Sequence, residues 1–367
     1  MDHAVDRARD LFDQLDADAA ATPAGEPVPQ SSVDAIIEAG VHAVSVPRDV
    51  GGLELPLSEA IDVWAELSRA DGSTGWCAFA ADITAAYFGA YLPDDGAATV
   101  FADGVPVMAG QFAPNGTATI DGTDLVVNGD YQFGSGIAHA SWVGAGVLAG
   151  PDAAEYLFTC FPADQAELRG NWDVLGLQAT ASYDYGVRDV RVPRSHSFDF
   201  FAPKVHRGGP MYALGVLPIT AAGHSGWALG VTRRALDELA ALATDTTRMG
   251  ASSSLAESER FLHEYGNLES RYLAGRAWIH ELLVGAEAQA ARDGGIDVTT
   301  ANLIRQACVH INRGGADIAR EAYLLAGTRA LRDGPLQRAF RDLHAGSQHF
   351  FASPASTIDL ARSLLTP

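Results

Sequence analysis

The segment at residues 341–350 reads Arg-Asp-Leu-His-Ala-Gly-Ser-Gln-His-Phe and lies close to the end of a 367-residue chain. It follows Pro335-Leu336-Gln337-Arg338, and it combines an Arg-Asp pair with a histidine, His349. A neutral imidazole can accept and donate a proton near neutral pH. His349 is therefore the first candidate for a catalytic residue, although a chain with 11 histidines can also carry one on a helix without a function.

Residues 1–105 have the pattern of a helical domain. Ser31-Ser32 can cap a short helix that stops at Gly40, a suitable glycine for a helix end. From Leu57 the apolar residues fall on one helical face, and Gly75-Trp76 begins another apolar segment. We expect an N-terminal domain built from these helices.

The pattern changes between residues 106 and 205. Turn dipeptides at Asp121-Gly122 and Asn128-Gly129 flank the short apolar run Leu125-Val126-Val127, and a similar run follows at 187–192. Turns at this spacing between β-branched runs predict antiparallel strands. The middle of the chain is therefore expected to form an antiparallel β domain.

Residues 206–367 are helical again. The segment from Ile219 to Ala243 begins apolar on most faces, which predicts a buried helix. Two further long segments, Ser254–Ala291 and Asn302–Leu325, have helical character. These helices are expected to pack as an antiparallel bundle, so the fold class is α+β.

Four blocks, in this order, carry a resemblance to a known family. They are 46–52 with 71–76, 112–116 with 128–142, 172–182 with 190–193, and the C-terminal segment 341–350. Together they resemble the acyl-CoA dehydrogenase-like flavoproteins. The resemblance implies an acyl-CoA dehydrogenase-like fold, with an N-terminal helical domain, a central antiparallel β barrel and a C-terminal four-helix bundle.

One position separates two branches of that family. In the dehydrogenases, a glutamate eight residues after the Arg-Asp aspartate removes the substrate's α-proton, whereas this chain has Phe350 there, next to His349. This arrangement resembles the flavin-dependent monooxygenases of the two-component, group D type. The resemblance implies an oxygenase component that uses reduced flavin and O₂, through a C4a-hydroperoxide, to hydroxylate an aromatic or polyketide-like small molecule. His349 would deprotonate a phenol-like substrate or form a hydrogen bond to the hydroperoxide.

The resemblance also implies which residues form the site. Ser135 is placed against the flavin ring near N5, where a hydroxyl can donate or accept as N5 changes protonation, so it joins His349 as a catalytic candidate. The positions that match flavin-contacting segments are Trp76, Gln111, Phe112, Phe133, Ser135, Gly136, Thr180 and Ser182. The expected substrate pocket contains Trp76, His139, His224 and Phe350. Each of these residues could instead have a purely structural role.

Three departures from the family pattern bear on the cofactor. The Gln-x-x-Gly-Gly segment that holds the adenine half of FAD is reduced to Leu325-Ala326-Gly327-Thr328. Arg248-Met249-Gly250 keeps only part of the pattern in which Arg248 would meet the flavin phosphates of a neighbouring subunit. Both departures favour reduced FMN, with FADH₂ as the alternative. The third, Gln178-Ala179-Thr180-Ala181-Ser182, has lost two glycines of the family's flavin loop, which weakens close backbone approach to the cofactor.

Composition and missing motifs exclude several other functions. The formal net charge of −21 opposes binding to nucleic acids or anionic membrane surfaces. Three cysteines without a Cys-x-x-Cys pair indicate neither a disulfide framework nor a metal site. No signal peptide or membrane span is apparent, so a cytoplasmic location is expected. No Gly-x-Gly-x-x-Gly follows a strand, so a separate flavin reductase is expected to supply the reduced flavin.

Two alternatives stay open at this point. The chain could be an acyl-CoA dehydrogenase-like oxidoreductase with its base elsewhere, although the region 214–230 contains no Asp or Glu. It could also be a non-catalytic subunit of a mixed oligomer, because the glutamate and two glycines of the flavin loop are lost. For the chain itself, the family implies a homo-oligomer, arranged as a dimer of dimers (a homotetramer).

Overall fold

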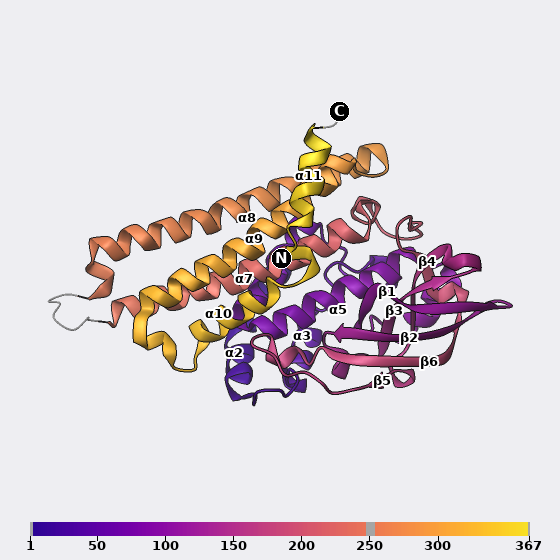
Figure 1. Cartoon of the computed structure of the whole chain (residues 1–367), viewed down its shortest axis with the longest axis horizontal. Coiled ribbons are helices and arrows are strands. Elements are labelled where there is room, and N and C mark those ends of the chain that lie inside the picture. The colour runs from indigo at the N-terminus through magenta and orange to yellow at the C-terminus, as the bar shows by residue number, and fades with distance from the viewer. Residues whose placement is uncertain (1–2, 247–253, 366–367) are drawn as a thin grey trace.

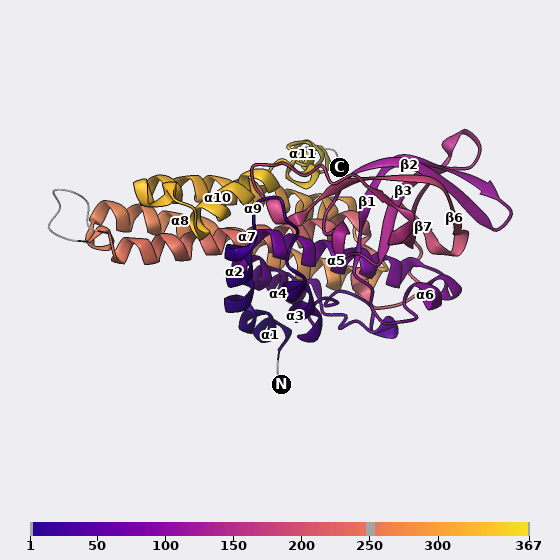
Figure 2. The same cartoon turned by 90° about the horizontal axis from the view of Figure 1, so that it is seen from below.

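Long helices and a sheet form the two ends of the molecule. The computed structural model describes residues 3–246 and 254–365. In Figure 1 the long helices of the C-terminal part extend to the left, the sheet lies to the right, and one helix, α5, runs between them. Figure 2, turned by 90°, shows the first helices of the chain gathered below this junction.

The helices that precede the sheet confirm the helical N-terminal region. They are α1 (Ala4–Asp10), α2 (Phe12–Ala21), α3 (Gln30–Glu38), α4 (Leu57–Ala70), α5 (Gly72–Tyr91) and α6 (Asp94–Val100). The predicted end of α3 is correct, since Gly40 follows the helix with φ of +64°. The predicted serine cap is wrong, because Pro29 precedes the first turn and the hydroxyls of Ser31 and Ser32 donate to Asp18 instead.

The central helix α5 begins earlier than its apolar pattern indicated. Asp71 caps it, because its carboxylate accepts hydrogen bonds from the backbone N–H and the hydroxyl of Thr74, both at 2.8 Å. The helix is buried along most of its length, so it can form a wall between the sheet and the C-terminal helices.

The central part is a mixed sheet of seven strands among the described residues, in the order β5-β6-β2-β1-β3-β4-β7. The strands are β1 (Met108–Asp121), β2 (Asp124–Gly134), β3 (Trp142–Ala149), β4 (Glu155–Pro162), β5 (Glu167–Leu168), β6 (Tyr183–Pro193) and β7 (Ser197–Asp199). The expected antiparallel barrel needs correction, since β1 pairs with β3 in parallel. The chain folds back from β1 into β2 and then crosses to the other edge of β1, so β3 runs in the direction of β1.

The two predicted turns have different outcomes. Gly122 lies in the turn between β1 and β2, with φ of +65°, as expected. Asn128-Gly129 lies inside β2, where the pairing with β6 shifts register between Val127 and Gly129. This dipeptide therefore forms part of a bulge rather than a turn, and the Asn128 side chain bonds across to Asp189.

The C-terminal helices form the expected bundle, with one further helix after it. They are α7 (Val216–Thr244), α8 (Glu259–Asp293), α9 (Val298–Ala326), α10 (Pro335–Gly346) and α11 (Ala355–Leu365). Helix α7 is buried on almost every face in its first half, in agreement with its apolar sequence. None of the helices in the described ranges has both the length and the apolar character that crossing a membrane requires.

One buried apolar cluster joins the first helices, one face of the sheet and the bundle. A second cluster lies within the sheet, around Val127, Tyr131 and Tyr185. Because the first cluster is continuous, the division of the chain at residues 105 and 205 stays a prediction. Helix α5 contacts both the sheet, through β1, and the bundle, through α7. The candidate site lies between these elements.

Candidate active site

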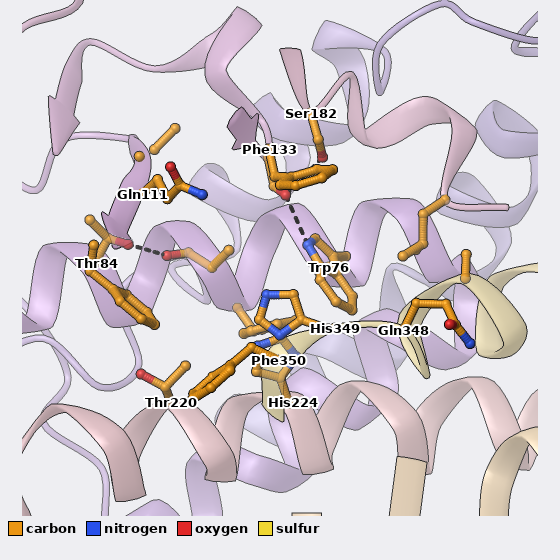
Figure 3. A pocket seen from close by; sticks show the side chains of 18 of the residues that line it. Trp76, Thr84, Gln111, Phe133, Ser182, Thr220, His224, Gln348, His349 and Phe350 are labelled. Carbon is orange, nitrogen blue, oxygen red and sulfur yellow. Dashed lines mark hydrogen bonds between the residues drawn. The ribbon is translucent and has the colours of Figure 1, made fainter. Parts of the chain in front are cut away.

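A cavity of about 820 Å³ lies where α5, the sheet, α7 and the end of α10 meet. Figure 3 shows side chains from these elements pointing into one space. Its polar lining consists of hydroxyls, amides and imidazoles, from Thr84, Tyr87, Gln111, Ser135, Ser182, Thr220, His224, His344, Gln348 and His349. No Asp, Glu, Lys or Arg is among the described residues that line it. A cavity of this size with few polar groups is typical of a small-molecule or cofactor site.

One face of α5 forms the longest wall. Trp76, Phe79, Ile83 and Tyr87 are three or four residues apart, so they lie on the same side of the helix. Trp76 packs edge-to-face against Phe79, with ring centroids 5.4 Å apart. The opposite wall comes from the sheet, chiefly from Phe112 on β1.

Bulges in the sheet direct aromatic rings toward the cavity. Phe133 lies where the register of β2 and β6 shifts, and its φ of +61° is uncommon for a residue with a side chain. The residue is 56% exposed, and its ring meets that of Trp172 edge-to-face with centroids 6.2 Å apart. Phe350, 57% exposed, lines the cavity from the C-terminal side. These rings lie at the mouth of the cavity and can cover a flat ligand.

A row of polar groups connects α5 to the loop before β6. The indole N–H of Trp76 donates to Oγ of Ser135 at 3.0 Å. Oγ of Ser135 is 2.8 Å from Oγ of Ser182, which is 2.7 Å from Oγ1 of Thr180. The Thr180 hydroxyl donates to the carbonyl of Leu177 at 2.8 Å. The sequence-predicted residues Trp76, Ser135 and Ser182 therefore meet at one wall of the cavity, with Thr180 behind them.

Two histidines form the floor beside this row. The rings of His224 and His349 have centroids 4.3 Å apart, and Trp76 contacts both, at 4.9 and 5.5 Å. Figure 3 shows the two rings together near the centre of the site. His224 comes from α7 and His349 follows α10, so the bundle supplies both imidazoles.

Burial keeps both imidazoles neutral. It lowers the pKa of His349 to about 4, and it lowers the pKa of His224 well below its usual value, with a further decrease from the nearby His349. Nδ1 of His349 accepts a hydrogen bond from the backbone N–H of Phe351 at 3.4 Å. The proton of the neutral ring is therefore on Nε2, so His349 can donate a hydrogen bond from that atom.

Asp342 of the Arg-Asp pair does not line the cavity, but it binds the backbone of Leu177, which does. Its Oδ1 accepts a hydrogen bond from the backbone N–H of Leu177 at 2.6 Å. Leu177 has φ of +57°, and a Cβ on Gly176 would lie 2.2 Å from the carbonyl oxygen of Arg341. Burial, then the charge of Asp71, raises the pKa of Asp342 to about 7. The C-terminal segment thus fixes the backbone of the loop that carries Thr180.

The structure separates three of the expected site residues, Gly136, His139 and Thr180, from the cavity. His139 and Gly136 line a different cavity, of about 50 Å³, on the opposite face of α5. The expected placement of His139 in the substrate pocket is therefore wrong, because a short turn at Ile137–His139 carries it behind the helix, where Nδ1 lies 3.1 Å from Gln30. Arg248 lies outside the described residues.

Several residues that line the cavity were not predicted. They are Phe79, Ala80, Ile83, Thr84, Tyr87, Ala109, Gly110, Phe158, Trp172, Val174, Leu175, Gly176, Leu177, Thr220, His344, Ala345 and Gln348. The members on α5 had a signal in the sequence, because they repeat at helical spacing from Trp76. Phe158 and Thr220 had none, since only the fold brings them to the cavity.

Comparisons with known proteins agree with this architecture. The model for the acyl-CoA dehydrogenase N-terminal domain matches residues 3–91, and the model for the acyl-CoA dehydrogenase C-terminal domain matches residues 222–354. An indole-3-acetate monooxygenase from Pseudomonas putida is 29% identical over 325 residues, which cover 87% of this chain and 82% of the relative. The oxygenase subunit HsaA, a flavin-dependent monooxygenase from Mycobacterium tuberculosis, is 24% identical, with 89% and 86% covered.

A solved structure shows the same fold over nearly the whole chain. The crystal structure of the HsaA monooxygenase from M. tuberculosis superposes with a TM-score of 0.90 at 20% identity, covering 98% of this chain and 96% of that one. The two domain models match on either side of the sheet, and this superposition also covers the sheet between them. The chain belongs to the acyl-CoA dehydrogenase-like flavoproteins, and its relatives there include the oxygenase subunit of a flavin-dependent monooxygenase.

Proposed function

We propose that this protein is the oxygenase component of a two-component flavin-dependent monooxygenase that hydroxylates an aromatic or polyketide-like small molecule. The observation that carries the proposal is the cavity itself, where hydroxyls and neutral imidazoles converge among aromatic rings and no described lining residue is charged. Such a site offers a few fixed hydrogen bonds in largely apolar surroundings, which oxygen transfer requires.

A reduced flavin fits the residues that are present. Trp76, Phe112 and Phe133 offer flat apolar surfaces for a ring system, and Ser135 and Gln111 offer polar atoms at its edge. When bound, the flavin supplies the electrons that activate O₂. We propose reduced FMN, with FADH₂ as the alternative, and O₂ as co-substrate.

His349 is the proposed catalytic residue from the bundle. With its proton on Nε2 and a pKa of about 4, it is a poor base at neutral pH and a good neutral donor. The geometry therefore favours the second of its two predicted roles, in which the imidazole N–H stabilises an oxygen that gains charge during transfer. Ser135 lines the same cavity and is the second proposed catalytic residue, and His224 packs against the His349 ring.

The same cavity argues against the dehydrogenase alternative. Abstraction of an α-proton needs a carboxylate within reach of the substrate, and no Asp or Glu is among the described residues that line the space. The first half of α7, where some relatives carry their base, presents His224 and Thr220 instead.

A separate flavin reductase would supply the reduced flavin. A homo-oligomer, with Arg248 reaching the flavin of a neighbouring subunit, can be tested by light scattering of the purified protein. The free thiols Cys77, Cys160 and Cys308 suit a reducing cytoplasm.

The experiment that tests the function is transfer of labelled oxygen. The protein is mixed anaerobically with photoreduced FMN, then exposed to ¹⁸O₂ with a panel of phenols and indoles, and products are analysed by mass spectrometry. We expect one ¹⁸O atom per hydroxylated product and a loss of that product in His349→Gln. His310→Gln, a change at an exposed bundle histidine, is the matched control.

Other outcomes would select an alternative. Flavin binding with only hydrogen peroxide formed from every compound, together with desaturation of an acyl-CoA in the presence of an artificial electron acceptor, would favour the dehydrogenase. Failure to bind either reduced or oxidised flavin would favour the non-catalytic subunit.

A further inference from the structure

The row of hydroxyls behind Ser135 has only one possible direction. It contains three oxygen–oxygen contacts of 2.7–2.8 Å, from Ser135 to Ser182, from Ser182 to Thr180 and from Thr180 to the Leu177 carbonyl. Two oxygens this close need a proton between them. The three hydroxyls have three protons in total, so each contact uses one of them.

The carbonyl end sets the direction. The Leu177 carbonyl can only accept, so Thr180 must give it its proton. Thr180 then accepts from Ser182, and Ser182 in turn accepts from Ser135. The other end agrees, because the indole N–H of Trp76 can only donate, and it donates to Ser135.

The surroundings hold this direction in place. Thr180 is fully buried and Ser182 is 3% exposed, so the contact between them is shielded from bulk water. The backbone of Leu177 is fixed on both sides. Its carbonyl also accepts from the Trp172 indole at 3.0 Å, and its N–H donates to Asp342 at 2.6 Å. Reversal of the row would require the Leu177 carbonyl to donate a proton, which it does not have.

The direction decides what Ser135 can offer to a ligand. Its proton points to Ser182, and one lone pair takes the Trp76 N–H. The remaining lone pair can face the cavity, which Ser135 lines. Ser135 is therefore an acceptor toward the cavity, although the residue type alone allowed it to donate as well.

We propose that Thr180 and Ser182 are positioning residues that make the site selective for a ligand with an N–H at Ser135, here the reduced flavin. N5 of a reduced flavin carries a hydrogen and can donate to Ser135, whereas N5 of an oxidised flavin can only accept and meets a second acceptor. This inference rests on the proposed function, because it needs the flavin ring to lie against Ser135.

The test compares the dissociation constants of oxidised and reduced FMN. Thr180→Val keeps the shape of the side chain and removes its hydroxyl, so Ser182 can donate to Ser135 and the Ser135 proton can turn to the cavity. We expect the ratio of the two constants to shift about three- to tenfold toward oxidised FMN, the size of one hydrogen bond. The midpoint potential of bound flavin should fall by ~14–30 mV accordingly.

Matched variants separate this effect from loss of structure. Thr180→Ser keeps the hydroxyl and should restore the wild-type ratio. Ser182→Ala breaks the row one step earlier and should shift the ratio in the same direction, which serves if Thr180→Val does not fold. Thr232→Val removes another buried hydroxyl, one that donates to Ala228 within α7, and should leave the ratio unchanged.

The failures of the two proposals can be told apart. If wild type binds neither form of FMN nor of FAD, the proposed function is refuted, and this inference with it. If both forms bind and folded Thr180→Val or Ser182→Ala keeps the wild-type ratio and potential, the positioning role is refuted while the proposed function stands.

Discussion

Replacement of Asp342 by asparagine should change how the stability of the protein depends on pH. The Asp342 carboxyl is buried at the start of α5, near Asp71, and its pKa is raised from an ordinary 3.8 to about 7. Asparagine keeps the oxygen that accepts the Leu177 N–H and removes the titration. The folded structure thus prefers the uncharged form of this side chain.

The sign and size of the effect follow from linkage. A carboxyl whose pKa is raised by folding contributes its full stability below the unfolded value of 3.8 and loses it as the pH rises through the folded value of about 7. The interval between the two values corresponds to about 4 kcal/mol, of which about 2.5 kcal/mol is lost between pH 5 and pH 8. Asp342→Asn does not titrate and avoids this loss.

Urea unfolding followed by tryptophan fluorescence measures the effect. Wild type and Asp342→Asn are unfolded at pH 5 and at pH 8, at one protein concentration, and the difference between them is compared across pH so that other titrating groups cancel. We expect the difference to move by about 2.5 kcal/mol in favour of the variant at pH 8. Asp103→Asn, at an exposed position, should show no such change. A difference for Asp342→Asn that is the same at both pH values would refute the reasoning.

Three further perturbations have definite outcomes. Gly176→Ala would bring a Cβ within 2.2 Å of the Arg341 carbonyl oxygen, so the free energy of unfolding should fall by about 1–3 kcal/mol in urea titrations. An unchanged free energy of unfolding would mean that the loop moves to accept the Cβ without cost. Trp227→Phe removes the indole donor to the Gly72 carbonyl at 2.8 Å and should lower the melting temperature through a loss of about 1–3 kcal/mol, an expectation that an unaltered melting curve would contradict. Because burial holds the pKa of His349 at about 4, product formation per reduced flavin should show no histidine step between pH 6 and 8, and a step near 6.5 in the wild-type profile would show the neutral-donor role to be wrong.

Local patterns were enough to predict most of the helices. The apolar run from Ile219 to Ala243 lies within α7, Val216–Thr244, since burial on all faces leaves a signal that does not depend on distant residues. The start of α5 was placed too late because Gly72 and Ser73 are not apolar, although the Asp71 cap was present in the sequence.

The sheet could be predicted only in part, because strand pairing is not a local property. Asn128-Gly129 is a frequent turn dipeptide, yet here the long pairing of β2 with β6 extends through it as a bulge. The parallel pairing of β1 and β3 depends on a crossover, and no residue within either strand indicates which edge the chain will reach.

The candidate site was predicted where motifs and structure coincide. Trp76, Ser135, Ser182 and His349 come together in the cavity, as the resemblance implied. Their protonation could not be predicted, since the direction of the hydroxyl row and the tautomer of His349 depend on distances across four segments of chain. Asp342 lies in the C-terminal segment 341–350, but its contact with Leu177 could be recognised only in three dimensions.

The position of His349 in the chain has a consequence for how the protein is made. Trp76 precedes His349 by 273 residues, so the apolar wall of α5 leaves the ribosome long before its cover is synthesised. Domains fold from the N-terminus during synthesis, and exposed apolar surface in such intermediates promotes aggregation. Until α10 docks and Asp342 reaches the Leu177 peptide, the nascent chain presents an open aromatic surface that chaperones can recognise. The cavity is complete only after His349 has been released.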